Sequence, residues 1–370
     1  MISARAPKYQ KLKALDLPPP LQVLPSLTEQ PHCLDTLSLA ERFEDLKQFG
    51  YNTHSFLSLY GGLTYFTVPE VVGYIPIIKT LGLILISGEP VCSSQAMAPL
   101  VTALEAYAKE EECSIGAIPV SEKSKKALEA VGFDSIYIGK EPIFDLQNLP
   151  KLRKSLRSAA NRTSRKGYKV VPYGPSYQEQ LEALCGEWQE ARELPPLEFL
   201  FQLRPLELMQ HKKYFLLVDE SDKLCAFLAC SPIYARNGWY LEDLIRHPDA
   251  ANGCTEFLLI KALESLAAEG YAMATLALAP LAGLPDKDET HPILNAILRL
   301  CYRHLSWLYH FQTLEYFKGK FQPSHWENNY FCVYRRGQRF GVTCSLLRSL
   351  MPRDILTIIK HKLEKRHLLR

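Results

Sequence analysis

The order of secondary-structure elements in residues 212–336 constrains the fold more than any other feature of this chain. Residues 212–248 contain turn sequences at Asp219–Lys223 and Arg236–Gly238, and they are predicted to form a set of antiparallel strands. A strongly amphipathic helix over 255–271 follows. The pattern then predicts a strand, a helix and two more strands, over 273–280, 292–307, 308–311 and 330–336. This order is typical of an α+β fold with helices on a mostly antiparallel sheet.

The first half of the chain shows a similar alternation. Residues 38–50 have apolar positions at helical spacing and finish at Gly50, which predicts a helix. Residues 56–69 are predicted to form a hairpin that turns at Gly61 and Gly62. Strands and helices are then predicted in alternation over 82–87, 94–112, 113–120, 121–132 and 134–139. Both halves therefore predict helices packed on a sheet.

The order of elements in each half resembles the fold of the GNAT acyltransferases. The resemblance implies an α+β fold class with two tandem GNAT-like domains, each a mostly antiparallel sheet flanked by helices. Likeness at the level of the fold does not by itself fix a function. The predicted division is a Pro-rich extension (1–36), an N-terminal domain (37–150), a C-terminal domain with the active site (151–338) and a basic amphipathic C-terminal helix (339–370).

The cysteines and the apolar segments indicate a cytoplasmic protein. The ten cysteines are scattered, without a Cys-x-x-Cys pair or a His-rich cluster, so we expect no metal site and a reducing compartment. The N-terminus lacks the apolar core of a signal peptide. The most apolar run, Val71–Cys92, is interrupted by Pro76 and Lys79 and is not expected to span a membrane. Peripheral contact with the inner face of the membrane stays open.

Two basic segments indicate an anionic partner. Residues 151–170 carry eight lysines and arginines and no acidic residue, and they predict a helix with a narrow apolar stripe. This helix is either a solvated face or a site for a polyanion such as tRNA. Residues 339–370 predict a basic amphipathic helix that either docks on the protein or lies on an anionic membrane surface. The candidate anion-binding residues are Arg153, Arg157, Arg162, Arg165 and Lys166.

Three short blocks occur in order within about 90 residues. They are "DLIRHPDAANGCTEFL" from Asp243, "LAPLAGL" from Leu278 and "LEYFKGKFQPSHWENNY" from Leu314. The first lies where a GNAT enzyme binds the CoA pyrophosphate at a helix N-terminus, but it contains a single glycine, Gly253. The third is a basic stretch lined with aromatic residues, which alone could be a simple turn.

Together the blocks resemble the catalytic C-terminal domain of the phosphatidylglycerol lysyltransferases, the multiple-peptide-resistance-factor family. The family's Asp-Leu-Met-Arg stretch is matched at residues 243–246, with Ile245 in place of Met. Its Tyr-Lys-Glu-Lys-Phe stretch is matched by Lys318, Lys320 and Phe321, with Gly319 in place of Glu, and one residue is added before Trp326. The resemblance covers roughly residues 38–336 and does not extend to the family's multi-span membrane portion.

The resemblance implies an aminoacyltransferase that moves an amino acid from aminoacyl-tRNA to a phosphatidylglycerol-like lipid or to another hydroxyl or amine acceptor. No cofactor is expected, because the aminoacyl ester is already activated and catalysis can consist of positioning and charge stabilisation. Aminoacyl-tRNA is the expected co-substrate, and a lipid or a membrane surface is the expected partner. Two alternatives remain open: an acetyl-CoA-dependent GNAT N-acyltransferase, and a non-catalytic module that binds an anionic surface.

The same blocks supply the candidate site residues. A carboxylate, Asp243 or Glu242, is expected to meet a cationic donor side chain. Asp243 and Arg246 are three positions apart, so both can face one site only if the strand bulges or ends between them. The candidate catalytic residues are Asp243, Arg246, Lys318 and Lys320, with the two lysines expected at the rim of a pocket. The candidate substrate-binding residues are Glu242, Asn252, Gly253, Glu256, Pro280, Gly283, Phe321, Trp326 and Tyr330.

Each assignment has a structural alternative. Asp243 and Arg246 could form an ion pair at the end of a strand. Lys318 and Lys320 could simply be solvated, and Trp326 could belong to the core or the rim, as could Tyr330. The observation that separates these alternatives is whether Asp243, Arg246 and the two lysines converge.

Overall fold

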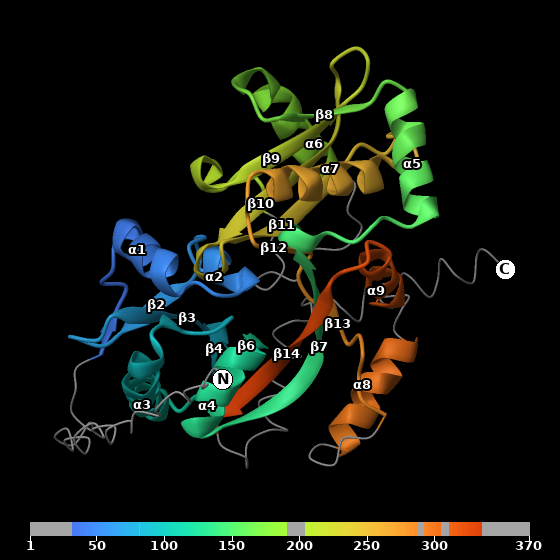
Figure 1. The fold of residues 1–370 in the computed structure, drawn as a ribbon. Coiled ribbons are helices and arrows are strands. Elements are labelled where there is room, and N and C mark those ends of the chain that lie inside the picture. The colour runs from blue at the N-terminus through green and yellow to red at the C-terminus, as the bar shows by residue number, and fades with distance from the viewer. Residues whose placement is uncertain (1–31, 81, 191–203, 287–291, 305–310, 335–370) are drawn as a thin grey trace, which may run out of the picture.

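A computed structural model describes residues 32–80, 82–190, 204–286, 292–304 and 311–334 (Figure 1). The strands form a sheet in the order β1-β2-β3-β4-β6-β14-β7-β12-β11-β10-β9-β8, with β5 added on β3 and β13 on β7. Two pairs, β4 with β6 and β11 with β12, are parallel, and the other pairs are antiparallel. The fold is therefore α+β with a mostly antiparallel sheet, as predicted.

The strands of the first half include one long central strand, β7, which runs from Phe133 to Asp145. The predicted strand over 134–139 was too short, because Lys140, Glu141 and Pro142 continue the strand. The others are β1 (Cys33–Leu34), β2 (Thr64–Thr67), β3 (Gly73–Thr80), β4 (Leu83–Ser87), β5 (Val91–Cys92) and β6 (Ser114–Ser121).

The strands of the second half form the other end of the sheet, apart from the last strand. They are β8 (Lys169–Pro172), β9 (Lys213–Val218), β10 (Leu224–Ile233), β11 (Gly238–Arg246), β12 (Met273–Thr275), β13 (Ala279–Pro280) and β14 (His325–Tyr334). β14 lies between β6 and β7, among the strands of the first half (Figure 1). Strands from both sides of residue 150 belong to one sheet. The division into two domains at this residue stays a prediction.

The helices of the first half begin at polar caps. α1 (Leu39–Phe49) has a capping box between Ser38 and Glu41, and its C-cap is Gly50, as predicted. α3 (Ser94–Glu110) packs on β3 and β6, where Leu100 and Leu104 are buried with the apolar residues of β4 and β6. The remaining helices are α2 (Thr53–Leu57), α4 (Glu122–Ala130) and the 3-10 turn η2 (Leu146–Asn148).

Helices of the second half cover both faces of the strands β9 to β11. α7 (Cys254–Ala268) packs on one face, and α6 (Gln178–Glu190) packs on the other. α5 (Lys154–Arg165) lies against α7 (Figure 1). The remaining elements are α8 (Pro292–His304), α9 (Phe311–Gly319) and the 3-10 turns η3 (Pro175–Tyr177), η4 (Met209–His211) and η5 (Tyr234–Arg236).

Three expectations need correction. The predicted hairpin over 56–69 is wrong: residues 53–57 form α2, because the Asn52 side chain accepts a hydrogen bond from the Ser55 backbone and starts a helix. The predicted strand over 308–311 is wrong at Phe311, which begins α9, and residues 308–310 lie outside the described part. The extension is shorter than 36 residues, since Cys33–Leu34 pairs with β2.

Two further predictions fall largely or wholly outside the described residues. They are the extension before residue 32 and the C-terminal helix over 339–370. Within the described residues, no helix combines the length and the apolar character needed to cross a bilayer.

Candidate functional site

A bulge in β11 places two carboxylates on the same face of the sheet. Asp243 lies opposite Ala229 of β10, and Leu241 lies opposite the next residue, Cys230, so Glu242 is an extra residue in β11. Because both residues of a bulge oppose one partner, Glu242 and Asp243 point towards the same side. Both are buried: Asp243 is 1% exposed, and the Glu242 side chain is 4% exposed.

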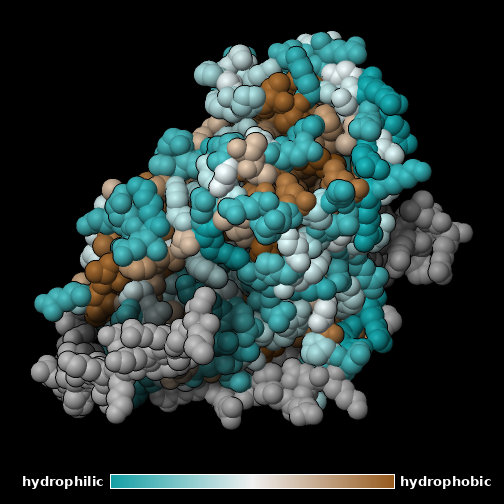
Figure 2. Space-filling model, viewed as in Figure 1, coloured by the Kyte–Doolittle hydropathy of each residue, from teal (hydrophilic) through white to brown (hydrophobic). Residues whose placement is uncertain are grey.

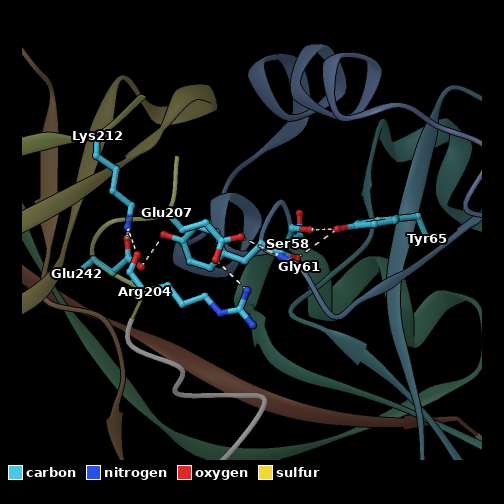
Figure 3. Close-up of polar contacts among 8 residues, drawn as sticks. Ser58, Gly61, Tyr65, Arg204, Glu207, Lys212 and Glu242 are labelled. Atoms are coloured by element: carbon cyan, nitrogen blue, oxygen red, sulfur yellow. Dashed lines mark hydrogen bonds and ion pairs between the residues drawn. The ribbon is translucent and has the colours of Figure 1, made fainter. Parts of the chain in front are cut away.

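Glu242 joins the two halves of the chain. Tyr60, which follows α2, donates a hydrogen bond of 2.8 Å to Glu242 Oε1. On the other side, Lys212 Nζ lies 3.4 Å from Glu242 Oε2, and it also donates to the Arg204 carbonyl oxygen at 2.9 Å (Figure 3). Glu207 extends the contact, since it accepts from the Gly61 backbone N–H at 3.0 Å. The loop after α2 is thus fastened to the chain that leads into β9.

Burial governs the electrostatics of this cluster. It raises the pKa of Glu242, while the Lys212 ammonium and the Tyr60 hydroxyl oppose that rise. Burial also raises the pKa of Tyr60 far above its ordinary value, with Glu242 and then Asp243 adding to the effect. Tyr60 therefore remains a hydrogen-bond donor, and Glu242 lies between this hydroxyl and one buried ammonium.

Asp243 and Arg246 do not face one site. β11 pairs regularly with β10 from Asp243 to Arg246, so the two side chains point to opposite faces. Arg246 is exposed and donates to the Ala250 carbonyl oxygen at 3.3 Å. The bulge lies before Asp243, where it aligns Asp243 with Glu242.

A second group of candidate residues gathers at the N-terminus of α7. Gly253 caps the helix with φ +97°, a left-handed conformation that favours glycine. Lys320 forms an ion pair of 2.5 Å with Glu256 in the first turn, and Phe321 is buried in the core beneath α7. Asn252 is exposed beside the cap. Arg246 and Lys320 therefore belong to a different neighbourhood from Asp243.

α5 covers the N-terminus of α7 with its apolar side. Leu156, Ala160 and Thr163 are buried, and a Cβ on Gly253 would lie 3.0 Å from Thr163 Oγ1. The opposite side of α5 is a hydrophilic strip (Figure 2). Seven cations between 151 and 166 are exposed and form no ion pair with any residue in the described ranges: Lys151, Arg153, Lys154, Arg157, Arg162, Arg165 and Lys166.

Lys318 lies in a third neighbourhood, at a gap in the sheet. β12 pairs with β7 up to Thr275 opposite Ile143, and β13 pairs again from Ala279 opposite Lys140. Between these pairings, residues 276–278 do not pair with β7, and residues 141–142 of β7 lie opposite them. Lys318 Nζ donates to the carbonyl oxygens of Ala277 at 2.9 Å and of Leu278 at 2.7 Å.

The expected rim position of Lys318 is wrong. Its side chain is buried, with the residue 6% exposed, because it enters this gap and satisfies two carbonyl groups that have left the ladder. Burial lowers the pKa of Lys318 to about 7, and the nearby Glu141 carboxylate opposes that shift. A group with this pKa is an efficient proton acceptor near neutral pH.

Glu141 and its neighbours were missed from the sequence. Glu141 lies on β7 directly opposite Glu327 of β14, and it is 5% exposed. Arg236 donates two hydrogen bonds to Glu327, at 2.8 and 2.6 Å, and stacks over the Tyr51 ring. Burial is the main cause that raises the pKa of Glu141 to about 7, and the negative charge of Glu327 raises it further. A signal existed in "KEPIF", where two adjacent charged residues precede a short apolar run.

The remaining candidates lie on β13, on the turn that follows it and on β14. Pro280 and Gly283 follow the gap, and Tyr137 donates to the Ala282 carbonyl oxygen at 2.7 Å. The Lys140 ammonium lies 4.7 Å from the centre of the Trp326 ring. Tyr330 is buried and hydrogen-bonds Glu122 of α4. Across the described residues, no group of histidine, cysteine and acidic side chains could hold a metal ion.

Comparison with known proteins gives a consistent result. Residues 43–333 match a family described as "Phosphatidylglycerol lysyltransferase, C-terminal". An uncharacterized protein of Corynebacterium glutamicum is 25% identical over 80% of this chain and 39% of its own length. The phosphatidylglycerol lysyltransferase of Staphylococcus haemolyticus is 23% identical over 92% of this chain and 40% of its own length. The chain thus spans about 40% of the length of these curated relatives.

Solved structures share the fold. L-PGS from Bacillus licheniformis superposes with a TM-score of 0.70 at 20% identity, over 85% of this chain and 97% of that one. The C-terminal domain of a putative lysylphosphatidylglycerol synthetase from Agrobacterium fabrum gives a TM-score of 0.70 at 17% identity, over 84% of this chain and 97% of that one. These likenesses establish that the chain shares the α+β fold of these two structures.

Proposed function

Because the chain belongs to the phosphatidylglycerol lysyltransferase C-terminal family, we propose that it is an aminoacyltransferase. It transfers an amino acid from aminoacyl-tRNA to a hydroxyl of a lipid such as phosphatidylglycerol. The observation that carries the proposal is the family match over residues 43–333. The matched residues include a buried lysine, Lys318, that is suited to proton transfer. The relatives' name supports the lipid acceptor.

The exposed cations of α5 support a polyanionic donor. Like charges three or four residues apart on a helix destabilise it by about 0.2–0.5 kcal/mol per pair. Lys154 with Arg157, and Arg162 with Lys166, are such pairs, and the N-terminus of α5 also carries positive charge against the helix dipole. These repulsions lower the stability of α5 when no anion is bound. Phosphate groups, such as those of the tRNA backbone, would offset the repulsions on binding and so stabilise the helix.

The transfer is a simple ester exchange. The acceptor hydroxyl oxygen attacks the ester carbonyl carbon of the aminoacyl-tRNA, a new ester bond forms, and the bond to the ribose oxygen breaks. The hydroxyl proton passes to Lys318 and then to the departing ribose oxygen, so the lysine ends unchanged. Because the aminoacyl ester and the products are similar in bond type, positioning and proton transfer suffice.

The carboxyl groups of β11 support a cationic amino acid as the transferred group. Glu242 lies 3.4 Å from the Lys212 ammonium, and the adjacent Asp243 adds a second buried carboxyl on the same side of the strand. Such a cluster attracts the ammonium of a donor residue more than a neutral side chain. The relatives are named as lysyltransferases, which agrees with this charge.

The CoA alternative receives less support from the fold. CoA-dependent enzymes of this fold bind the pyrophosphate at the helix that follows the central strands, and here that helix is α7. Thr163 and Ala159 of α5 already approach Gly253 at its first turn. No observation on this chain favours CoA over a tRNA donor.

The test is incubation of the protein with radiolabelled aminoacyl-tRNAs and vesicles that contain phosphatidylglycerol. Label is expected in the organic extract, and it should fall to background for Lys318→Met but not for Lys261→Met, which removes an exposed lysine of α7 that pairs with Glu264. Thermal stabilisation by CoA together with no lipid labelling for any of the twenty amino acids would contradict the proposal.

A further inference from the structure

The ladder of the sheet opens between β7 and β11, at the gap where Lys318 lies. β11 pairs with β12 only as far as Tyr240 opposite Thr275. β7 pairs with β12 as far as Ile143 opposite the same threonine. The next residues of the chain, 276–278, pair with neither strand. Beyond this point the edges of β7 and β11 that face each other have no strand between them.

An acidic residue lies on each side of this gap, on the same face of the sheet. Ile143, Thr275 and Tyr240 lie opposite one another on three neighbouring strands, so their side chains share a face. Glu141 lies two residues before Ile143, and strand alternation places it on that face. Glu242 lies two residues after Tyr240 and points to the same side. Because neighbouring strands are about 4.8 Å apart, β7 and β11 are about 10 Å apart across the gap.

Glu141 is a buried acid without a counter-charge among the described residues. It is 5% exposed and lies directly opposite Glu327 of β14. Glu327 accepts two hydrogen bonds from Arg236, whereas Glu141 forms no ion pair or side-chain hydrogen bond within the described ranges. Like charges directly opposite each other destabilise a sheet, and a buried carboxylate without a partner is strongly disfavoured. This position therefore suits an acid whose counter-charge comes from a bound cation.

The lysine suited to proton transfer lies at the β7 side of the same gap. Lys318 Nζ donates to the carbonyl oxygens of Ala277 and Leu278, just before β13, which pairs with β7. Its helix, α9, is fixed to the opposite face of β7 by the ion pair of Lys140 with Glu315 at 3.0 Å. The ester carbonyl of an aminoacyl donor is attached to the α-carbon. A donor that reacts near Lys318 would therefore have its α-amino group on the β7 side and its side chain towards β11.

We propose that Glu141 binds the α-ammonium group of the transferred amino acid, while Glu242 and Asp243 receive the ammonium of its side chain. This inference rests on the proposed function, because it assigns the two ends of that enzyme's donor. A lysyl group carries ammonium groups at both ends of one flexible carbon chain, which matches acids on two strands with a gap between them. Each ammonium donates to a carboxylate oxygen in a charge-assisted hydrogen bond of about 2.7–2.9 Å.

The assignment can be tested by binding alone, with three small amides as probes. Lysinamide carries both ammonium groups, norleucinamide keeps only the α-ammonium, and ε-aminocaproamide keeps only the side-chain ammonium. Isothermal titration calorimetry of the full chain at about pH 7, where α-amino groups are mostly protonated, gives the dissociation constants. Glu141→Gln should weaken binding of lysinamide and norleucinamide by roughly tenfold to hundredfold, the effect of one hydrogen bond to a charged group, and should leave ε-aminocaproamide unchanged.

Three other variants complete the experiment. Asp243→Asn should show the complementary pattern, with weaker binding of lysinamide and ε-aminocaproamide and unchanged binding of norleucinamide. Glu264→Gln is the matched control, since it changes an exposed acid of α7 that pairs with Lys261, and it should alter none of the three. Circular dichroism checks that each variant is folded. If Glu141→Gln does not fold, Glu141→Asp, which keeps the charge on a shorter side chain, should show the same selective loss to a smaller extent.

The outcomes separate this inference from the proposed function. A loss that is equal for all three amides, or no loss, overturns the role of Glu141, and so does a wild type that fails to bind lysinamide. A selective loss supports the role even if no lipid is labelled, and that second result then counts against the proposed function alone. Lipid labelling without a selective loss leaves the proposed function standing and removes Glu141 from the site.

Discussion

Replacement of Lys318 by methionine should change how stability depends on pH. The native pKa of Lys318, about 7, lies below its ordinary value of 10.5. Between these values the unfolded chain binds a proton that the native protein does not, so the free energy of unfolding of the wild type rises with pH in this window. Below pH 7 both states are protonated, and the full penalty of burying the ammonium remains.

The magnitude follows from 1.36 kcal/mol per pKa unit. From pH 7 to pH 9.5, titration of this single group should raise the unfolding free energy of wild type over that of Lys318→Met by about 3 kcal/mol. The assay is urea unfolding followed by circular dichroism at both pH values. Lys320→Met is the matched control, because it removes an ammonium that has the Glu256 carboxylate as partner and access to solvent. Parallel pH dependences for wild type and Lys318→Met would refute the reasoning.

Three further predictions concern α5, Glu242 and Gly253. The double variant Arg157→Gln, Arg165→Gln removes two positive charges from α5. It should reduce the steepness with which log affinity for tRNA falls with log salt concentration by about 1.5, whereas Lys261→Gln, at an exposed position, should leave that slope unchanged. Filter binding at several salt concentrations measures the slopes. Tyr60→Phe removes the hydrogen-bond donor to buried Glu242 and should lower the free energy of unfolding in urea by about 1–3 kcal/mol. The control Tyr316→Phe, at a residue that is 76% exposed, should leave that free energy unchanged. Gly253→Ala should destabilise by about 1–2 kcal/mol because of its positive φ, and Gly186→Ala inside α6, with no atom near the new Cβ, should stabilise; equal shifts in melting temperature would count against the strained cap.

Local signals in the sequence predicted most helices and strands. Ser38 and Gly50 bound α1 because a side-chain cap and a glycine end a helix through contacts within a few residues. The hairpin predicted over 56–69 failed because a capping box between Asn52 and Ser55 outweighed the turn signal at Gly61 and Gly62.

The site was harder to predict because its contacts are distant in the chain. The three blocks led to Lys318 and Asp243, but burial of Lys318 depends on the carbonyls of Ala277 and Leu278, about 40 residues away. Glu141 lies nearly 190 residues before Glu327, and the sheet order that brings these two residues opposite each other is not encoded in any local pattern. The bulge that pairs Glu242 with Asp243 also shows no sequence signal beyond the two adjacent acids.

The measurement that tests the central claim most directly is a single-turnover transfer. Protein in excess is mixed with labelled lysyl-tRNA and phosphatidylglycerol vesicles, and the label is followed on both tRNA and lipid. The account predicts that label leaves the tRNA and appears on the lipid at the same rate and in equal amounts, and that Lys318→Met abolishes both. Label that stays on the tRNA, for lysine and for every other amino acid tried, would contradict it.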